Sequence, residues 1–144
     1  MAQAVRKLNE EEFERWWPDI SKELDTIPHL WDIWWTKEAL HDCVLGGSLQ
    51  CWVAGTDGLA ELVVFTMVSA YPSGSILRSI LLFGRGIDSY LDVLDATFED
   101  FARQMGAKVI QVEGRPGWEP RLKKLGFGRR QIVMFRDVLE TRRH

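Results

Sequence analysis

Residues 75–112 read SILRSILLFGRGIDSYLDVLDATFEDFARQMGAKVIQV, and this stretch decides the fold. Its first part, 75–83, is almost continuously apolar and is bounded by turn formers, which predicts a buried strand. A Gly-Arg-Gly turn at 84–86 ends that strand. Apolar residues then recur at helical spacing as far as Gly106, and a second strand is predicted over 108–112. The order of elements predicts a βαβ unit.

The start of this predicted helix is where we expect a ligand. Ser89 and Asp92 stand three residues apart, the spacing of a capping box, so the helix is expected to begin there. The turn and the helix start lie at the carboxyl end of the first strand. Free N–H groups and the helix dipole favour an anion at such a place. The sequence therefore predicts a nucleotide-type pocket.

This unit resembles the GCN5-related N-acetyltransferases (GNAT), in which it holds the pyrophosphate and pantetheine of acetyl-CoA. In the family the loop reads Arg or Gln, two residues, Gly, one residue, then Gly or Ala. Here Arg85 is kept, whereas Asp88 and Tyr90 stand at the two small positions. A carboxylate brings like charge to the pyrophosphate, and a Cβ hinders the approach of backbone N–H groups to phosphate. The cofactor loop is therefore degenerate, and weakened cofactor affinity is expected.

A second motif, WEPRLKKLGF at 118–127, is similar to the fourth helix of the family and its Leu-Gly-Phe turn. In many relatives a tyrosine three residues before that Leu protonates the departing CoA thiolate, and an asparagine begins the helix. Leu122 and Arg115 occupy those positions here. Leucine has no proton to donate, so the usual general acid is absent. Its helical spacing from Leu125 indicates packing against the sheet.

The resemblance implies an acyl-CoA-dependent N-acyltransferase with acetyl-CoA as cofactor. Its acceptor would be a small amine, a protein N-terminus or a lysine. The strand backbone would bind pantetheine and the loop would bind phosphate. The residues implied for cofactor binding are Leu81, Leu82, Phe83, Arg85, Gly86, Ile87 and Ser89.

Acyl transfer needs a base that removes a proton from the acceptor amine. Glu61, early in the predicted third strand, and Glu113, directly after the 108–112 strand, are the candidates. A carboxylate in apolar surroundings has a raised pKa, which suits a base near neutral pH. The alternative is a solvated strand-end glutamate or a partner for Arg115. His29 and His41 have no neighbouring nucleophile pattern and are interpreted as surface or packing residues.

Composition narrows the class of protein. The 144 residues are 46% hydrophobic and 27% charged, which suits one domain over 1–144. The net charge of -3 argues against a nucleic-acid binder. No apolar run approaches the roughly 20 residues that cross a bilayer, and residues 1–8 are too polar for a signal peptide, so a cytoplasmic location is expected. Ligand spacings for a metal are absent, and Cys43 and Cys51 are predicted to be buried thiols.

The remaining segments complete the predicted fold. The expected class is α/β: a single-domain, GNAT-like mixed, mostly antiparallel sheet flanked by helices. The order is one strand, two helices, three strands, helix, strand, helix and a last strand. The supporting segments are a strand at 5–8, a helix capped by Asn9, a helix from Thr36 to Leu45, a hairpin formed by 49–54 and 59–68, and a final strand at 131–138.

Five of the seven tryptophans lie in the N-terminal third, as Trp16-Trp17 and within 31–35. One interpretation is that these rings close the core between helices and sheet, because aromatic side chains bury much area. The other is an exposed aromatic surface, since Trp34 and Trp35 cannot both face one side of an element. In GNAT enzymes this loop also helps to form the acceptor pocket.

The whole pattern, including Gly-Trp-Glu at 117–119, is also similar to small GNAT-like proteins encoded among bacteriophage structural genes. That resemblance implies a catalytically inactive virion or assembly protein, located in the host cytoplasm or in the virion. It would act through contacts with phage structural proteins, and a homo-oligomer is a further expectation. Fold would then not carry the enzymatic function. An enzyme needs an open cleft, whereas an assembly protein needs an apolar or aromatic interface.

Overall fold

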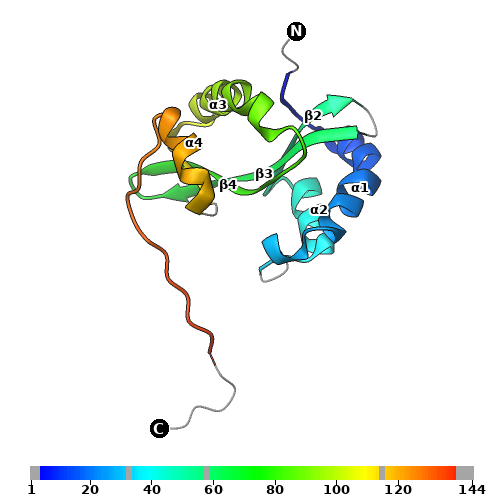
Figure 1. Cartoon of the computed structure of the whole chain (residues 1–144), viewed down its shortest axis with the longest axis horizontal. Helices are drawn as coiled ribbons and strands as arrows, with labels where there is room; N and C mark the ends of the chain where they lie inside the picture. Colours follow the sequence, from blue (N-terminus) through cyan, green and yellow to red (C-terminus); the bar gives the residue numbers. More distant parts are fainter. Residues whose placement is uncertain (1–3, 32–33, 57–58, 114–115, 139–144) are drawn as a thin grey trace.

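The chain folds into one five-stranded sheet with helices on both faces (Figure 1). This computed structural model describes residues 4–31, 34–56, 59–113 and 116–138. Neighbouring strands follow the chain order and are antiparallel, except that β4 and β5 are parallel. The elements are β1 (Arg6–Lys7), α1 (Glu10–Asp25), the 3-10 helix η1 (Pro28–Leu30), α2 (Lys37–Leu45), β2 (Gln50–Thr56), β3 (Leu59–Tyr71), β4 (Gly74–Phe83), α3 (Ile87–Gln104), β5 (Ala107–Val112), the 3-10 helix η2 (Pro116–Trp118) and α4 (Glu119–Lys124). The predicted α/β class with a mixed, mostly antiparallel sheet is confirmed.

The first two helices begin where the sequence predicts. The Asn9 side chain accepts a hydrogen bond from the Glu12 amide at 2.8 Å, and the Glu12 carboxylate accepts one from the Asn9 amide at 3.2 Å. That backbone donor is the main reason why the pKa of Glu12 is lowered. Thr36 caps α2 by accepting from the Ala39 amide at 3.0 Å, and Gly46 ends it. Both caps satisfy N–H groups that the helix itself leaves free.

The core forms one layer on each face of the sheet, because successive side chains of β2 and β3 point to opposite faces and both faces are covered by helices. Cys51 and Val53 face α1 and α2, whereas Trp52 faces α3. The Trp52 ring meets Phe98 and Phe101 edge-on, with centroids 5.2 and 5.0 Å away. Burial raises the pKa of the Cys51 thiol. The predicted burial is therefore correct for Cys51, while the other cysteine, Cys43, is half-buried.

A β-bulge halfway along β4 changes which side chains of the strand point to which face of the sheet. Phe65 of β3 lies opposite Leu81, and Thr66 lies opposite Ser79, so Ile80 is the extra residue. Before the bulge Leu77 packs in the α3 layer. After it, Leu81 and Phe83 pack in the α1 and α2 layer. A single inserted residue therefore turns the second half of β4 over.

The predicted last strand at 131–138 is wrong for this structure. Residues 128–138 form neither helix nor strand and are exposed, and they leave the body as an extended tail (Figure 1). A strand forms only where its backbone finds a partner. Here Arg129 donates to both carboxylate oxygens of Glu119 on α4, at 2.7 and 2.6 Å, and the chain continues away from the sheet.

Both interpretations of the tryptophans hold in part. Trp16 is buried at 2% exposure, and Trp31 and Trp35 pack partly against the core. Trp34 is 67% exposed, and its ring centroid lies 5.4 Å from that of Phe135 in the tail. Residues 32 and 33 lie outside the described residues. The loop therefore divides its rings between core and surface, as expected for consecutive residues pointing in different directions.

Candidate functional site

The two parallel strands separate at the bulge, because their pairing ends at Ser79, directly before Ile80. β4 pairs with β5 from Ser75 to Ser79, and a last hydrogen bond runs from the Glu113 amide to the Ser79 carbonyl at 3.2 Å. Beyond this point, β4 continues to Phe83 paired only with β3 in the described part of the chain. The backbone of residues 81–83 therefore faces the space that β5 has left. Unpaired strand backbone is able to hydrogen-bond an extended ligand.

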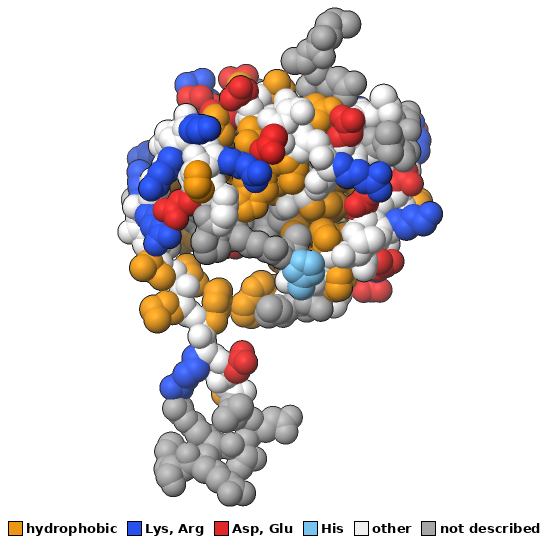
Figure 2. All heavy atoms as spheres, in the orientation of Figure 1, with side chains coloured by type: hydrophobic (Ala, Val, Ile, Leu, Met, Phe, Trp, Pro, Cys, Tyr) orange, Lys and Arg blue, Asp and Glu red, His pale blue; other side chains and the backbone are white. Residues whose placement is uncertain are grey.

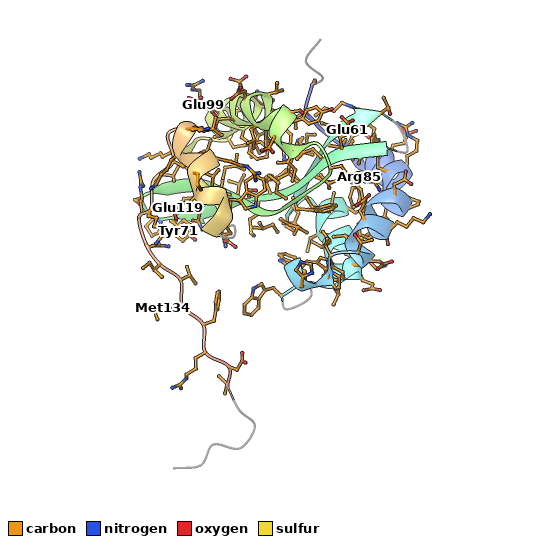
Figure 3. All side chains as sticks on the ribbon, viewed as in Figure 1. Glu61, Tyr71, Arg85, Glu99, Glu119 and Met134 are labelled. Carbon is orange, nitrogen blue, oxygen red and sulfur yellow. The ribbon has the colours of Figure 1, made fainter. Side chains whose placement is uncertain are left out.

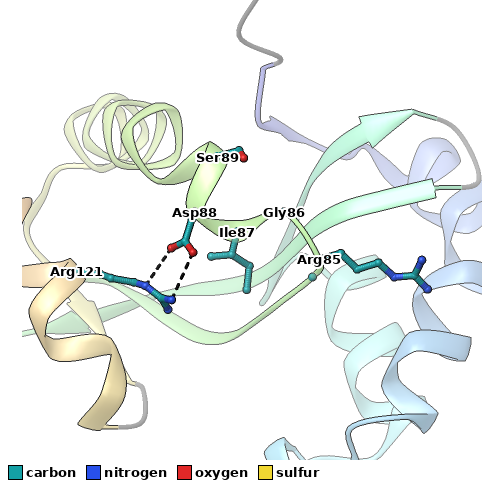
Figure 4. A pocket seen from close by; sticks show the side chains of 7 residues that line it. Arg85, Gly86, Ile87, Asp88, Ser89 and Arg121 are labelled. Carbon is teal, nitrogen blue, oxygen red and sulfur yellow. Dashed lines mark hydrogen bonds and ion pairs between the residues drawn. The ribbon is translucent and has the colours of Figure 1, made fainter.

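A pocket of about 400 Å³ lies where β4 runs into α3 (Figure 4). Its helix, α3, begins at Ile87 with Gly86 as an N-cap that has no capping side chain. The predicted capping box of Ser89 and Asp92 is therefore wrong, because the helix starts earlier and Ser89 lies in its first turn. Residues that line the pocket are Gly84, Arg85, Gly86, Ile87, Asp88, Ser89 and Arg121.

Some backbone N–H groups at the start of α3 already donate a hydrogen bond to a backbone carbonyl, and others do not. The Gly86 amide donates to the Glu61 carbonyl at 3.0 Å, and the Ser89 amide donates to the Gly86 carbonyl at 3.0 Å. Within the described residues, the amides of Ile87 and Asp88 have no backbone partner. Free donors at a helix start, together with the helix dipole, favour an anion. The predicted anion site therefore includes the N–H groups of Ile87 and Asp88, whereas those of Gly86 and Ser89 are already used.

β3 holds the loop in place through its backbone. Gly84 has φ +147°, and a Cβ there would lie 2.2 Å from the Glu61 carbonyl oxygen. A Cβ on Gly86 would lie 3.4 Å from the Tyr90 ring. Gly84 is thus required for the close approach of the loop to β3, whereas a Cβ on Gly86 would make only an ordinary van der Waals contact. Sequence reasoning assigned Gly86 to phosphate, whereas its amide is used in this packing.

An ion pair crosses the pocket. Asp88 Oδ1 lies 2.9 Å from Arg121 Nε, and the two residues come from α3 and α4 (Figure 4). Arg85 lines the same pocket, but its side chain points away from this pair, and its guanidinium lies 3.6 Å from Glu23 of α1. Arg121 was missed from sequence because α4 carries several cations, Arg121, Lys123 and Lys124. Only the docking of the helix decides which one reaches the pocket.

Glu61, a predicted base, is hydrogen-bonded to Tyr90, the residue that stands at the second small position of the family loop. The Tyr90 hydroxyl donates to the Glu61 carboxylate, and this bond is the main cause of the raised pKa of Tyr90. Burial adds to the shift, since Tyr90 is only 6% exposed. The ring therefore fills the space under the loop and links α3 to β3.

Glu113, the other predicted base, lies at the point where β4 and β5 separate. Its carboxylate accepts from Arg78 of β4, and from Gln111 Nε2 at 3.3 Å. Arg115, the partner considered from sequence, lies outside the described residues. The structure does not bring the two candidate carboxylates into one cluster: Glu61 lies under the α3 loop and Glu113 lies at the strand split. Each already has a hydrogen-bond partner.

His29, His41 and Leu122, which were also considered from sequence, are not among the residues that line the pocket, and His29 is exposed in η1. His41 contacts Glu14 through Nε2 and packs against Trp17, with ring centroids 5.1 Å apart. Leu122 is half-buried in α4, and its carbonyl accepts from the Phe127 amide at 3.1 Å. In the described part of the chain, no group of three His, Cys, Asp or Glu residues is placed to hold a metal ion. No described helix is long and apolar enough to span a membrane.

Comparison with known proteins finds similarity in structure. No protein-family model and no curated protein matches the sequence. An acetyltransferase from Trypanosoma brucei has a TM-score of 0.68 and 15% identity, over 94% of this chain and 99% of that one. An aminoglycoside acetyltransferase from an uncultured soil metagenomic sample, in complex with sisomicin, has a TM-score of 0.68 and 11% identity, over 96% and 97%.

A predicted acetyltransferase from Clostridium acetobutylicum, solved with acetyl-CoA, has a TM-score of 0.67 and 14% identity, over 96% of this chain and 98% of that one. The chain therefore has the fold of GNAT acetyltransferases along nearly its whole length. At these identities the similarity establishes the fold, and function has to be argued from the site.

Proposed function

We propose that the protein is an acyl-CoA-dependent N-acyltransferase that uses acetyl-CoA. The observation that carries this proposal is the separation of β4 and β5 after Ser79, which leads directly into the uncapped start of α3. An unpaired strand edge followed by free helix amides suits an extended chain that ends in a pyrophosphate. The similar fold of the C. acetobutylicum acetyltransferase solved with acetyl-CoA supports this choice of cofactor.

Each part of the site has a role in this proposal. The backbone of Leu81, Leu82 and Phe83 binds the pantetheine amides as a short added strand. The amides of Ile87 and Asp88 bind the pyrophosphate, and Arg121 supplies a positive charge beside them. Arg85, Gly86 and Ser89 form the rest of the phosphate-binding wall. Asp88 competes with the phosphate for Arg121, so the affinity is lower than in a loop with glycine at this position.

The reaction is a direct transfer. The acceptor nitrogen attacks the thioester carbonyl carbon, the C–S bond breaks, and the amine proton passes to a base. Glu113 is better placed than Glu61 for this role, because it lies at the strand split whereas Glu61 lies under the α3 loop. Glu113 has to act as base beside its partner Arg78. Leu122 has no proton for the sulfur. A thiol with a pKa of about 8.5 leaves as a thiolate, which water then protonates.

Calorimetric titration with acetyl-CoA and with CoA tests the proposal. Micromolar binding is expected, followed by acetyl transfer to a small amine, a protein N-terminus or a lysine. Glu113→Gln should lower transfer while binding is kept. The matched control is Glu99→Gln on the exposed side of α3, where Glu99 contacts Arg103 at 2.7 Å. Absence of binding at millimolar ligand would contradict the proposal.

A second candidate is a catalytically inactive GNAT-fold assembly protein, such as a bacteriophage virion component, that acts through protein contacts. The observation that favours it is the Asp88–Arg121 ion pair, which occupies the pocket where a cofactor phosphate would bind. Side chains that satisfy one another leave less electrostatic attraction for a ligand. Failure to bind both CoA and acetyl-CoA, together with incorporation into a larger assembly, would support this candidate.

A further inference from the structure

The tail exposes a run of large apolar side chains that nothing in the described structure covers. Exposed fractions are 73% for Ile132, 63% for Val133, 87% for Met134, 72% for Phe135 and 93% for Val138. Figure 2 shows hydrophobic side chains along the chain where it leaves the body. Contiguous apolar surface of this kind marks an interaction site in a soluble protein. The ring contact between Phe135 and Trp34 leaves both residues about two-thirds exposed or more.

The pattern of the tail is that of a strand inside a sheet. Successive side chains of an extended chain point to opposite faces. Ile132, Met134 and Val138 would then face one side, and Val133 and Phe135 the other. Both faces are apolar, as in strands covered on both sides. Such a segment is stabilised by pairing with an existing sheet edge.

β5 offers such an edge. It pairs with β4 on one side, and no described strand pairs with its other side. The Glu113 amide points toward β4, and amide directions alternate along a strand, so the amides of Val112 and Ile110 point to the open side. No residue of β5 is fully buried, whereas β2 and β4 each bury several. An unpaired, partly uncovered edge is a template for strand addition.

The tail of the same chain is directed away from this edge. Arg129 is fixed to Glu119 by two hydrogen bonds. Phe135 lies beside Trp34, which belongs to the segment of chain that connects α1 to α2. In Figure 3, Met134 lies on the extended tail, away from the sheet and its helices. Eight extended residues span about 26 Å, enough to cross to another molecule. These contacts favour pairing between molecules over folding back.

We propose that residues 131–138 add to the open edge of β5 in a second copy of this chain, and that the second copy returns the same contact. The product is a two-fold dimer with exchanged C-terminal strands, in which both contacts are identical. Each tail gains backbone partners, and each β5 becomes an internal strand. This dimer does not depend on whether the pocket binds acyl-CoA.

Light scattering after size exclusion tests the proposal on the full chain. We expect twice the 16.6 kDa mass of one chain. Truncation after Arg130 and the double change Val133→Asp with Phe135→Asp should each give the single-chain mass while a cooperative thermal unfolding transition is kept. The control Asp137→Asn, which alters a polar tail residue, should stay dimeric. A monomeric full chain, or a dimer that survives truncation, overturns the proposal.

A mixing experiment separates exchange between chains from folding back within one chain. Val112→Pro removes an outward amide from the β5 edge while the tail is kept. Mixed with the chain truncated after Arg130, it should form a heterodimer with one exchanged strand, although each variant alone is monomeric. No heterodimer in this mixture overturns the proposal. If Val112→Pro does not fold, Ile110→Pro, which also removes an outward amide from the β5 edge, replaces it.

Discussion

The Asp88 carboxylate lies 2.9 Å from the Arg121 guanidinium, and this ion pair joins the start of α3 to α4 across the pocket. Both side chains are substantially exposed, at 70% and 45%, so the pair adds little to the free energy of folding. Its importance is local. Arg121 lines the same pocket as the free amides of α3, and Asp88 forms an ion pair with it.

Asp88→Asn should strengthen CoA binding, because it removes a negative charge beside the phosphate site and releases Arg121. We expect about a five- to tenfold lower dissociation constant by calorimetry, on the order of 1 kcal/mol. The control is Asp92→Asn, which removes the same charge one helical turn later, outside the pocket lining. Equal effects of the two substitutions would show that only net charge matters.

Arg121→Gln should weaken CoA binding more than Arg85→Gln does. A charged hydrogen bond to phosphate contributes about 1.5 to 3 kcal/mol, which corresponds to roughly ten- to a hundredfold in affinity. Arg85 is 76% exposed and faces Glu23, so its removal should cost less. The dissociation constants of both variants are compared at one salt concentration. The reverse order would mean that Arg85 turns into the pocket when ligand binds.

Tyr90 should titrate above the usual range of a tyrosine. Its hydrogen bond to Glu61 and its burial raise its pKa. Because the folded protein holds the proton more tightly, stability should fall as pH rises above the unfolded pKa of about 10. The Tyr71→Phe variant leaves Tyr90 as the single tyrosine, so ultraviolet absorption of the phenolate reports it alone.

Tyr90→Phe should also lower the free energy of unfolding by about 1 to 2 kcal/mol, since it leaves the partly buried Glu61 carboxylate without this donor. Tyr71→Phe serves as the matched control for denaturant unfolding. A Tyr90 phenol that ionises together with an exposed tyrosine would contradict the bond to Glu61.

Arg129 should set the ionisation of Glu119. Its hydrogen bonds hold the pKa of Glu119 below the usual range. A lowered carboxyl pKa contributes stability above the unfolded value of about 4.3, and this contribution is lost as pH falls through the folded pKa. Carboxyl NMR titration should show the Glu119 pKa rising in Arg129→Gln. Lys123→Gln, which removes a cation 4.0 Å away, should change it less.

Gly84→Ala should destabilise the fold by more than about 3 kcal/mol, because the new Cβ would meet the Glu61 carbonyl at 2.2 Å. Gly126→Ala is the control. It also has positive φ, at +91°, but nothing lies within 4 Å of its Cβ position, so a cost of about 1 kcal/mol is expected. Equal midpoints in urea for the two variants would exclude the close approach of the loop to β3.

The sequence by itself was sufficient for most of the fold. Caps at Asn9 and Thr36 and the apolar periods of α1, β4 and α3 are local signals, and local signals survive folding. The position of the loop at the carboxyl end of β4 followed from element order. The first turn of α3 did not follow from the sequence. The helix begins at Ile87, earlier than the Ser89 and Asp92 spacing indicates, and its start is held to β3 by the hydrogen bonds of the Gly86 amide and the Tyr90 hydroxyl to Glu61.

The composition of the site required tertiary structure. The partners of Glu61 and Glu113, and the choice of Arg121 among the cations of α4, depend on contacts between residues far apart in sequence. The tail shows the same limit. Residues 131–138 have a strand pattern, but a pattern fixes only the side-chain alternation of a strand. Whether the strand forms depends on a sheet edge within reach, and in a single chain the Glu119–Arg129 bonds lead the tail away from β5.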